Sequence, residues 1–249
     1  MTQASILILK TGEAPAPVKS RHGDFDAWIA RELGESLDRI QVASVYLGEP
    51  LPEPASIRGV VVTGSPAMVT ERPEWSEASA RWLADIVRED SVPVLGICYG
   101  HQLIAHGLGG EVGPNPNGRE MGTVEIAIDF GAETGGSTAR SVAQGFEVIF
   151  EPGKFPAHMS HVESVLRPPD GARVLARTAL DPHSVLEFGP RQWGVQFHPE
   201  FDREIMRSYV EARREILVSE RLDPDAMISE AEETTAITRV LARFAHYVT

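Results

Sequence analysis

The sequence predicts an α/β fold with a mostly parallel central sheet, helices on both of its faces and a small appended antiparallel sheet. Two observations carry this prediction. In the N-terminal half, short and continuously apolar runs, typical of strands buried on both faces, alternate with longer segments of helical periodicity. Beyond residue 120, short alternating segments separated by Pro, Gly and Asp turns replace that rhythm, as expected of antiparallel strands.

The elements of the N-terminal half follow from these patterns. Strands are predicted at residues 5–10, 39–47, 59–63 and 92–97, with the Pro/Gly-rich residues 11–20 as a loop. A helix is predicted from Asp24 to a stop at Gly34, with Trp28 on its buried face, and a second at 73–90. The second helix is expected to bury one apolar side, formed by Trp75, Ala78, Trp82, Leu83, Ile86 and Val87.

The sequence pattern of the C-terminal half predicts a set of antiparallel strands followed by helices. Strands are expected at 121–128, at 146–150 and in several short pieces between 157 and 195, with a Gly/Thr-rich turn at 129–138; the chain returns to the sheet at 192–200. Helices are expected at 203–217 and 223–246, the latter charged but docked through a modest apolar stripe. Because no repeat or low-complexity segment appears, we interpret 1–249 as one domain with 219–249 as a C-terminal helical extension.

Composition limits the function classes. Acidic residues outnumber basic ones 36 to 23, and the net charge of −13 with no basic stripe argues against a nucleic-acid partner. No apolar run approaches the roughly 20 residues that span a membrane, no signal-peptide pattern is present, and one cysteine forms no internal disulfide. We therefore expect a cytoplasmic protein with no membrane partner. The histidines lack metal-ligand spacing, so no metal or other cofactor is expected.

The most informative stretch is residues 92–105, where an apolar strand ends at Gly-Ile-Cys-Tyr-Gly and a helix-compatible segment follows at once. This is the pattern of a nucleophile elbow, in which Cys98 stands at a sharp turn before a helix N-terminus. Gly96 and Gly100 lack the Cβ atoms that would collide in so tight a turn. The partial positive charge of the helix N-terminus favours a thiolate. Taken alone, the pattern fits a buried structural cysteine equally well.

Two further motifs support catalysis. In an extended segment, His198 and Glu200 point to the same side, so the carboxylate can orient the imidazole and the imidazole can take the thiol proton. Gly64 directly follows a buried strand, where backbone can approach a ligand. Each motif has a structural explanation by itself; together they predict a Cys-His-Glu triad beside a glycine loop.

The motifs Gly-Ile-Cys-Tyr-Gly-His-Gln at 96–102 and Gln-Phe-His-Pro-Glu-Phe at 196–201, preceded by Gly-Ser-Pro at 64–66, resemble those of the class I, or triad, glutamine amidotransferases. Within that family they are most similar to the glutaminase domain of GMP synthase and its free-standing relatives. The resemblance covers about residues 5–217 and implies a flavodoxin-like topology.

The resemblance also implies roles for individual residues. Cys98 attacks the side-chain amide of glutamine to give a γ-glutamyl thioester and ammonia, His198 acts as base and then acid, and Glu200 orients His198. The implied oxyanion hole lies at the backbone N–H groups of Tyr99 and of the loop at Gly64 and Ser65. The substrate's α-amino and α-carboxylate groups are implied to meet Gln102 and the backbone around Ser160, His161 and Val162.

The chain departs from the GMP synthase pattern in three ways. Ser65 stands where the GMP synthase domain carries glycine, Val162 stands where close relatives often have glycine, and neither an ATP-pyrophosphatase half nor a P-loop is present. Two functions stay open: a glutaminase that supplies ammonia to a separate synthetase or acceptor subunit, and a γ-glutamyl peptide hydrolase. The substrate is glutamine or a γ-glutamyl compound in either case.

Three other interpretations fit less well. A cysteine α/β-hydrolase shares the elbow, but its acid precedes its histidine in the chain, whereas Glu200 follows His198. A DJ-1-like cysteine protein shares the sheet but leaves the His-Pro-Glu motif unexplained. A non-catalytic binding or regulatory module is the alternative from another class, and the intact triad argues against it.

Overall fold

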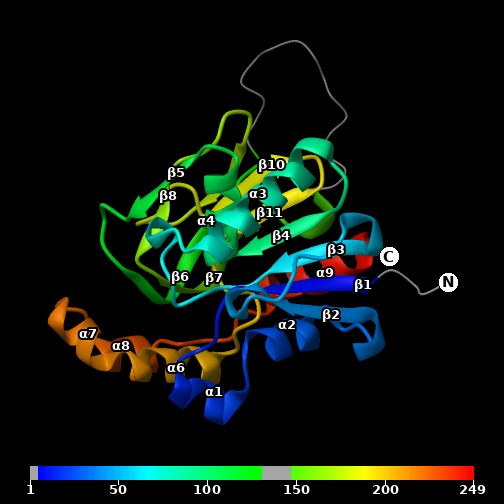
Figure 1. Ribbon diagram of the computed structural model, residues 1–249. Coiled ribbons are helices and arrows are strands. Elements are labelled where there is room, and N and C mark those ends of the chain that lie inside the picture. Colours follow the sequence, from blue (N-terminus) through cyan, green and yellow to red (C-terminus); the bar gives the residue numbers. More distant parts are fainter. Residues whose placement is uncertain (1–4, 131–146) are drawn as a thin grey trace.

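The computed structural model describes residues 5–130 and 147–249 (Figure 1). These residues form a nine-stranded sheet in the order β2-β1-β3-β4-β11-β10-β9-β6-β7 and a two-stranded antiparallel sheet of β5 and β8. The parallel strands are β1 (Ser5–Lys10), β2 (Ile40–Ser44), β3 (Ile57–Val62), β4 (Val94–Ile97) and β11 (Gln192–Val195). The antiparallel strands are β5 (Glu111–Pro114), β6 (Glu120–Ile128), β7 (Gly153–His161), β8 (Glu163–Arg167), β9 (Arg173–Arg177) and β10 (Val185–Gly189). The predicted α/β fold class and flavodoxin-like strand order are therefore confirmed.

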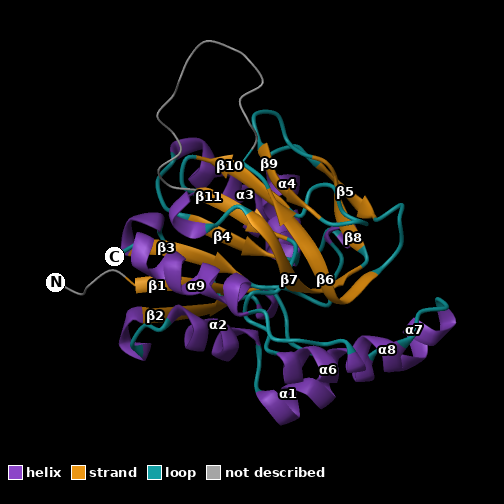
Figure 2. Cartoon of the chain, turned by 180° about the vertical axis from the view of Figure 1, so that it is seen from behind, coloured by secondary structure: helices purple, strands orange, loops and turns teal. Residues whose placement is uncertain are grey.

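Alternate side chains of β1 face two separate apolar layers. Ile6 and Ile8 pack with residues of α2 (Phe25–Leu33) and α9 (Thr235–Tyr247) on one face of the sheet (Figure 2). Leu7 and Leu9 pack with residues of α3 (Glu74–Glu89) and α4 (Tyr99–Gly107) on the other. Because successive side chains of a strand point to opposite faces, a continuously apolar run is what a sheet covered on both sides requires.

A third apolar cluster lies beside the sheet. It is built from α1 (Ala16–His22), α2, α6 (Arg203–Ala212) and neighbouring segments, with α8 (Pro224–Ser229) packed against α6 and α7 (Arg214–Ser219) beyond it. Both views show α1, α6, α8 and α7 in a row along this side of the molecule (Figures 1 and 2). Trp28, Phe201 and Tyr209 form its aromatic centre. Trp28 is a core residue, as expected.

The strand register brings three segments to one edge of the sheet. Val62 of β3 lies opposite Gly96 of β4, and Ile97 of β4 lies opposite Val195 of β11. Since these strands are parallel, the residues that follow them emerge side by side at their carboxyl ends. The glycine loop, the cysteine and the His-Pro-Glu segment are thereby gathered at one place from far apart in the sequence.

Several predicted elements are wrong in the N-terminal half. Residues 11–20 are not a continuous loop, because α1 begins at Ala16; proline is compatible with a first helical turn, and Val18 is fully buried. The strand predicted at 39–47 ends at Ser44, and a 3₁₀ turn (Val45–Leu47) ends at the left-handed Gly48. On α3, the predicted Trp75, Ala78 and Trp82 are only half-buried, whereas the small Ser76, Ser79 and Ala80 are buried on the helix that packs against α4.

The C-terminal half also differs in detail. Residues 147–149 are helical rather than a strand, and most of the turn predicted at 129–138 lies outside the described residues. The helix predicted at 203–217 breaks at Arg213: Ile205 and Tyr209 before the break are buried, whereas Ala212 and Ile216 are exposed. The helix predicted at 223–246 is two helices, because the acidic residues 230–233 follow the C-terminal end of α8, where negative charge opposes helix continuation.

The C-terminal segment nevertheless docks on the sheet. Leu241 and Phe244 of α9 are fully buried in the layer shared with α2. Within residues 5–130 and 147–249, no helix is long and apolar enough to cross a membrane.

Candidate active site

Cys98 occupies a strained turn between β4 and α4. Its φ of 50° and ψ of −100° place a non-glycine residue outside the favoured regions, which is common at functional sites. Main-chain hydrogen bonds hold it there: its N–H donates to Val195 O at 2.8 Å, and its carbonyl accepts from the N–H of Gln102 at 3.1 Å. The residue is buried, with 6% of it exposed. The backbone therefore fixes the position of the sulfur.

The glycines of the elbow serve close packing, as predicted. A Cβ on Gly96 lies 2.6 Å from the carbonyl carbon of Gly100, and a Cβ on Gly100 lies 2.7 Å from Val62. Both contacts involve backbone or a buried strand that has no room to move. Glycine at both positions lets α4 begin directly against β3 and β4.

His198 and Glu200 form a buried pair next to Cys98. His198 Nδ1 lies 2.7 Å from Glu200 Oε1, with side chains 3% and 0% exposed. The His198 ring stacks on Phe201 at a centroid distance of 4.1 Å, and the backbone N–H of His198 donates to His158 O at 2.9 Å. Residues 196–200 are bends and a turn, not the extended segment assumed from the sequence. The two side chains meet because the chain turns at Pro199, which aims the carboxylate at Nδ1.

The surroundings favour a protonated His198. Burial by itself lowers the pKa of His198, but the negative charges of Glu200 and Cys98, with their hydrogen bonds, raise the pKa well above its usual value. The neighbouring His158 behaves in the opposite way: burial and the charge of His198 lower its pKa to about 4. His158 therefore stays neutral while His198 carries the proton.

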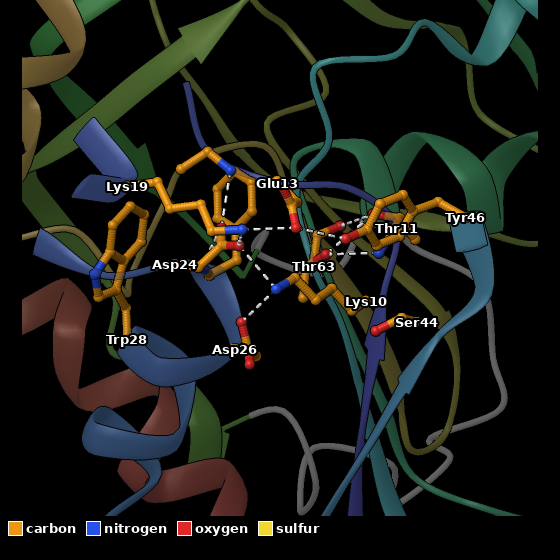
Figure 3. Close-up of polar contacts among 12 residues, drawn as sticks. Lys10, Thr11, Glu13, Lys19, Asp24, Asp26, Trp28, Ser44, Tyr46 and Thr63 are labelled. Atoms are coloured by element: carbon orange, nitrogen blue, oxygen red, sulfur yellow. Dashed lines mark hydrogen bonds and ion pairs between the residues drawn. The ribbon is translucent and has the colours of Figure 1, made fainter. Parts of the chain in front are cut away.

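A hydrogen-bond network fixes the glycine loop. The Thr11 hydroxyl lies 3.0 Å from both Thr63 Oγ1 and the carbonyl of Gly64 (Figure 3). Ser65 Oγ donates to Thr11 O at 2.8 Å and accepts from the N–H of Ala67 at 3.2 Å. The Ser65 hydroxyl, which a Gly-Gly-Pro loop lacks, therefore holds the loop to the end of β1.

Gly64 and Tyr99 lie on either side of the reacting groups. A Cβ on Gly64 lies 2.9 Å from His198 Cε1, so this position has no space for a side chain. Tyr99 is the first residue of α4, and its N–H has no partner within the helix. The Tyr99 ring is turned away, with its hydroxyl 2.6 Å from Ser76 Oγ.

A buried ion cluster supports the same edge of the sheet. Lys10 Nζ lies 2.8 Å from Asp24 and 2.7 Å from Asp26 (Figure 3). Asp24 also accepts from the N–H groups of Ala14 and Phe25 at the start of α2. Phe25 in turn stacks near His198, with ring centroids 6.3 Å apart. This cluster orders the packing around the imidazole.

A cavity of about 270 Å³ opens over Cys98. Seven of the residues predicted for the site line it: Ser65, Cys98, Tyr99, Gln102, Ser160, His161 and Val162. Gly64, His198 and Glu200 are not lining residues; the latter two are buried behind the cysteine. Val162 is half-buried and occupies the wall where close relatives often have glycine.

Two of the residues predicted to hold substrate have their side-chain nitrogens engaged by the protein. Gln102 Nε2 donates to Glu163 O at 2.6 Å and to Gln196 Oε1 at 3.0 Å. The ring nitrogens of His161 lie 3.0 Å from Glu163 O and 3.0 Å from Glu120 Oε2. These side chains shape the wall, which leaves Ser160 and the backbone of 160–162 facing the cavity.

Sequence reasoning missed Glu163. Its buried carboxylate accepts from Val69 N at 2.9 Å, from Thr70 N at 3.4 Å and from the Thr70 hydroxyl. These bonds tie the 3₁₀ turn Val69–Glu71, which follows the glycine loop, to the opposite wall of the cavity. The partners lie more than ninety residues apart in the sequence, so no local pattern pointed to this contact.

Arg119 and Arg213 were missed as well, and both line the cavity. Arg119 pairs with Glu220 through two hydrogen bonds of 2.7 and 2.9 Å. Arg213 stands at the break between α6 and α7, with its guanidinium 4.8 Å from the centre of the Tyr209 ring. Both arginines lie outside the recognisable motifs, and an isolated arginine in a sequence carries no signal of its position.

Comparison with known proteins supports one family. The model of the class I glutamine amidotransferases matches residues 22–213. A glutamine-hydrolysing GMP synthase of Aeropyrum pernix is 38% identical over 187 residues, and one of Neisseria meningitidis serogroup B is 32% identical over 204 residues. These matches cover 72% and 80% of this chain but 32% and 33% of the relatives, so the chain spans about a third of their length.

Solved structures share the fold. A glutamine amidotransferase from Thermotoga maritima superposes with a TM-score of 0.72 at 20% identity, covering 99% of both chains. A putative GMP synthase subunit from Thermoplasma acidophilum gives a TM-score of 0.56 at 17% identity, covering 88% of this chain and 98% of that one.

Among the described residues, no group of three or more His, Cys, Asp or Glu side chains is placed to hold a metal ion.

Proposed function

The chain belongs to the class I glutamine amidotransferases, and from that membership we propose that it hydrolyses the side-chain amide of glutamine through a γ-glutamyl thioester on Cys98. Ammonia is released for an acceptor on another protein. One observation carries the proposal: a strained cysteine at the start of α4 lies next to a histidine whose pKa it raises, and a buried glutamate holds the Nδ1 side of that histidine. That arrangement meets the requirements for an activated thiol nucleophile.

In the first step the thiolate sulfur of Cys98, whose proton already lies on His198, forms a bond to the amide carbon of glutamine. The raised pKa of His198 favours this placement of the proton. Glu200 holds Nδ1 through its 2.7 Å contact, so the remaining ring nitrogen faces the sulfur. Negative charge develops on the amide oxygen. We assign its stabilisation to the N–H of Tyr99 and to the backbone of the loop at Gly64 and Ser65.

In the second step the carbon–nitrogen bond breaks, and the leaving nitrogen takes the proton from His198 and departs as ammonia. Water then attacks the thioester with His198 as the base, which yields glutamate and restores the thiol. The α-amino and α-carboxylate groups are assigned to the wall formed by Gln102 and the backbone of Ser160, His161 and Val162. The contacts of Gln102 and His161 with Glu163 keep that wall in place.

The acceptor is assigned to a separate protein chain. The curated relatives are glutamine-hydrolysing GMP synthases about three times as long as the matched region, and a structural neighbour is described as a putative GMP synthase subunit. Both descriptions support an arrangement in which a glutaminase unit supplies a synthetase unit.

A second candidate is γ-glutamyl peptide hydrolysis, in which the same thioester forms and an amine larger than ammonia leaves. Val162 and the two arginines of the cavity favour it, because they alter the wall and offer positive charge to a larger substrate.

Turnover on the isolated protein tests the proposal. The ratio of kcat/KM for glutamine to that for a γ-glutamyl dipeptide distinguishes the two candidates. A ratio favouring the dipeptide tenfold or more, unchanged by candidate synthetase partners, selects the peptidase. Labelling of Cys98 by a diazo-ketone analogue of glutamine at low excess supports either enzyme. Absence of both turnover and labelling contradicts the proposal and favours a non-catalytic module.

A further inference from the structure

The catalytic cavity holds two positively charged side chains in a strongly acidic protein. Arg119 immediately precedes β6, and Arg213 lies at the break between α6 and α7. The protein has a net charge of −13, so positive charge gathered at one concave site is not a consequence of composition. Both arginines line the same cavity as Cys98.

The two arginines differ in how their charge is matched. Arg119 is neutralised by Glu220 in a two-pronged ion pair. Arg213, in contrast, lines the cavity and makes no ion pair with any carboxylate that the structure describes. A guanidinium stays charged, so it can pair with the carboxylate of a ligand in the cavity.

The position of Arg213 is fixed by the aromatic residues behind it. Its guanidinium lies over Tyr209, the Tyr209 ring lies 4.6 Å from Phe201, and Phe201 stacks on His198. This row of rings runs from the cavity wall to the triad. The guanidinium is therefore held at a defined place relative to the reacting groups.

We propose that Arg213, with Arg119 beside it, forms a carboxylate-binding subsite of the catalytic cavity and thereby selects the substrate. The planar guanidinium fork matches two carboxylate oxygens. This inference rests on the proposed function, which defines the substrates as γ-glutamyl compounds. Two sources supply a carboxylate: the α-carboxylate of the γ-glutamyl group, which Arg213 then holds in addition to the wall of Gln102 and residues 160–162, and the carboxylate of an amino acid leaving group.

Four substrates separate these sources. L-Glutamine and L-glutamine α-amide differ only in the α-carboxylate, and γ-glutamylglycine and γ-glutamylglycinamide differ only in the carboxylate of the leaving group. Each is assayed with the wild type, Arg213→Gln and Arg213→Lys, which keeps the charge but loses the fork. Arg214→Gln is the matched control, because Arg214 is the adjacent arginine and its contacts run to Glu211 and Asp225, away from the cavity lining.

We expect Arg213→Gln to lower kcat/KM by roughly 10- to 100-fold, mainly through KM, for substrates carrying the bound carboxylate. If kcat/KM falls for every substrate except L-glutamine α-amide, the carboxylate bound by Arg213 is the α-carboxylate. If kcat/KM falls for γ-glutamylglycine alone, the bound carboxylate is that of the leaving group. Arg213→Lys should recover part of the loss, and Arg214→Gln should match the wild type. Equal loss on all four substrates, or no loss on any, overturns the subsite.

A binding measurement separates this inference from the proposed function. Calorimetric titration of γ-glutamylglycine, which carries both carboxylates, into Cys98→Ala does not depend on turnover. Addition of Arg213→Gln to Cys98→Ala should weaken the affinity at least tenfold, while thermal unfolding reports whether the double variant is folded. Unchanged affinity in a folded double variant overturns the subsite even if the enzyme is active. If no substrate is turned over by the wild type but affinity still depends on Arg213, the catalytic proposal alone fails.

Discussion

The two walls of the catalytic cavity are built in different ways. The wall that carries Cys98 belongs to the parallel strands, where main-chain hydrogen bonds and close-packed glycines fix each atom. The facing wall is assembled from the antiparallel strands and the α6–α7 break, and side-chain contacts such as those of Glu163 and Arg119 hold it. We infer that the first wall performs the chemistry and the second selects the substrate. Substitutions in the first should therefore change kcat, and substitutions in the second should change KM.

The largest effect is expected at the nucleophile. Cys98→Ala should reduce hydrolysis of glutamine and γ-glutamyl compounds to background, because no other described side chain in the site can form the thioester. The sheet core does not depend on one thiol, so the melting temperature should stay close to that of the wild type. Wild-type turnover by this variant would mean that the triad is assigned wrongly.

The next largest losses of activity are expected at His198 and then at Glu200. His198→Ala should lower kcat by roughly 10²- to 10⁴-fold, the usual contribution of a positioned acid and base. Glu200→Gln should be milder, because the amide oxygen can still accept from Nδ1–H while the negative charge is lost. Steady-state kinetics at saturating substrate measure both. A larger loss for Glu200→Gln than for His198→Ala contradicts the assigned roles.

Gly64→Ala tests how tightly the first wall is built. The added Cβ lies 2.9 Å from His198 Cε1, so the loop or the imidazole must shift. A displacement of this kind should lower kcat by roughly 10²-fold with little change in KM. Gly113→Ala is the matched control, since its Cβ meets only the flexible end of Leu166, remote from the cavity lining. Equal kinetics for both variants would show that the loop tolerates the shift.

Glu163→Gln tests the second wall. The amide keeps one acceptor but offers an N–H₂ group to Val69 N–H or to the Thr70 hydroxyl, so at least one bond to the 3₁₀ turn is weakened. We expect KM to rise about fivefold, in keeping with the loss of one buried hydrogen bond, while kcat changes less. Glu111→Gln, an exposed residue of β5, is the control. A fall in kcat with unchanged KM would contradict the division between the walls.

The smallest effect concerns acid stability and applies to both walls. Burial lowers the pKa of His101, on α4, and of His158, on β7, to about 4 each. The unfolded chain then binds more protons than the folded one between about pH 6.5 and pH 4, so the free energy of unfolding falls as the pH falls through that range. Each histidine should contribute a loss of about 2 kcal/mol between pH 7 and pH 5.

Urea unfolding at the two pH values measures this loss. His158→Gln should remove the part of the pH-dependent stability loss that His158 contributes, because glutamine does not titrate. Glutamine also retains a hydrogen-bond partner for Thr123. His246→Gln, at an exposed position, should leave the pH dependence unchanged. An unaltered pH dependence in His158→Gln would mean that this histidine is not buried in the neutral form.

Local patterns in the sequence were sufficient for one wall of the cavity and insufficient for the other. The apolar runs predicted the parallel strands, and the spacing of Gly96, Cys98 and Gly100 predicted the elbow, because both depend on neighbours in the chain. The extended geometry assumed for His198 and Glu200 was wrong, yet two residues so close in sequence still meet through a turn. The helix break at Arg213 was missed because propensity alone does not show where tertiary contacts stop a helix. The break at residues 230–234 was missed because the apolar spacing was given more weight than the negative charges of Glu230, Glu232 and Glu233.

By itself, the sequence determined the fold class, the cysteine at the end of a buried strand and the His-Pro-Glu segment that resembles the triad of its family. Strand burial and tight turns follow from residue types over a few positions, and such information is local. Only the tertiary structure decided that Glu163 anchors the turn after the glycine loop, that Ser65 is tied to Thr11, and that Arg213 lines the cavity of Cys98 without an ion-pair partner among the described residues. These contacts join segments far apart in the chain, and they depend on strand register and helix packing that no short stretch of sequence encodes.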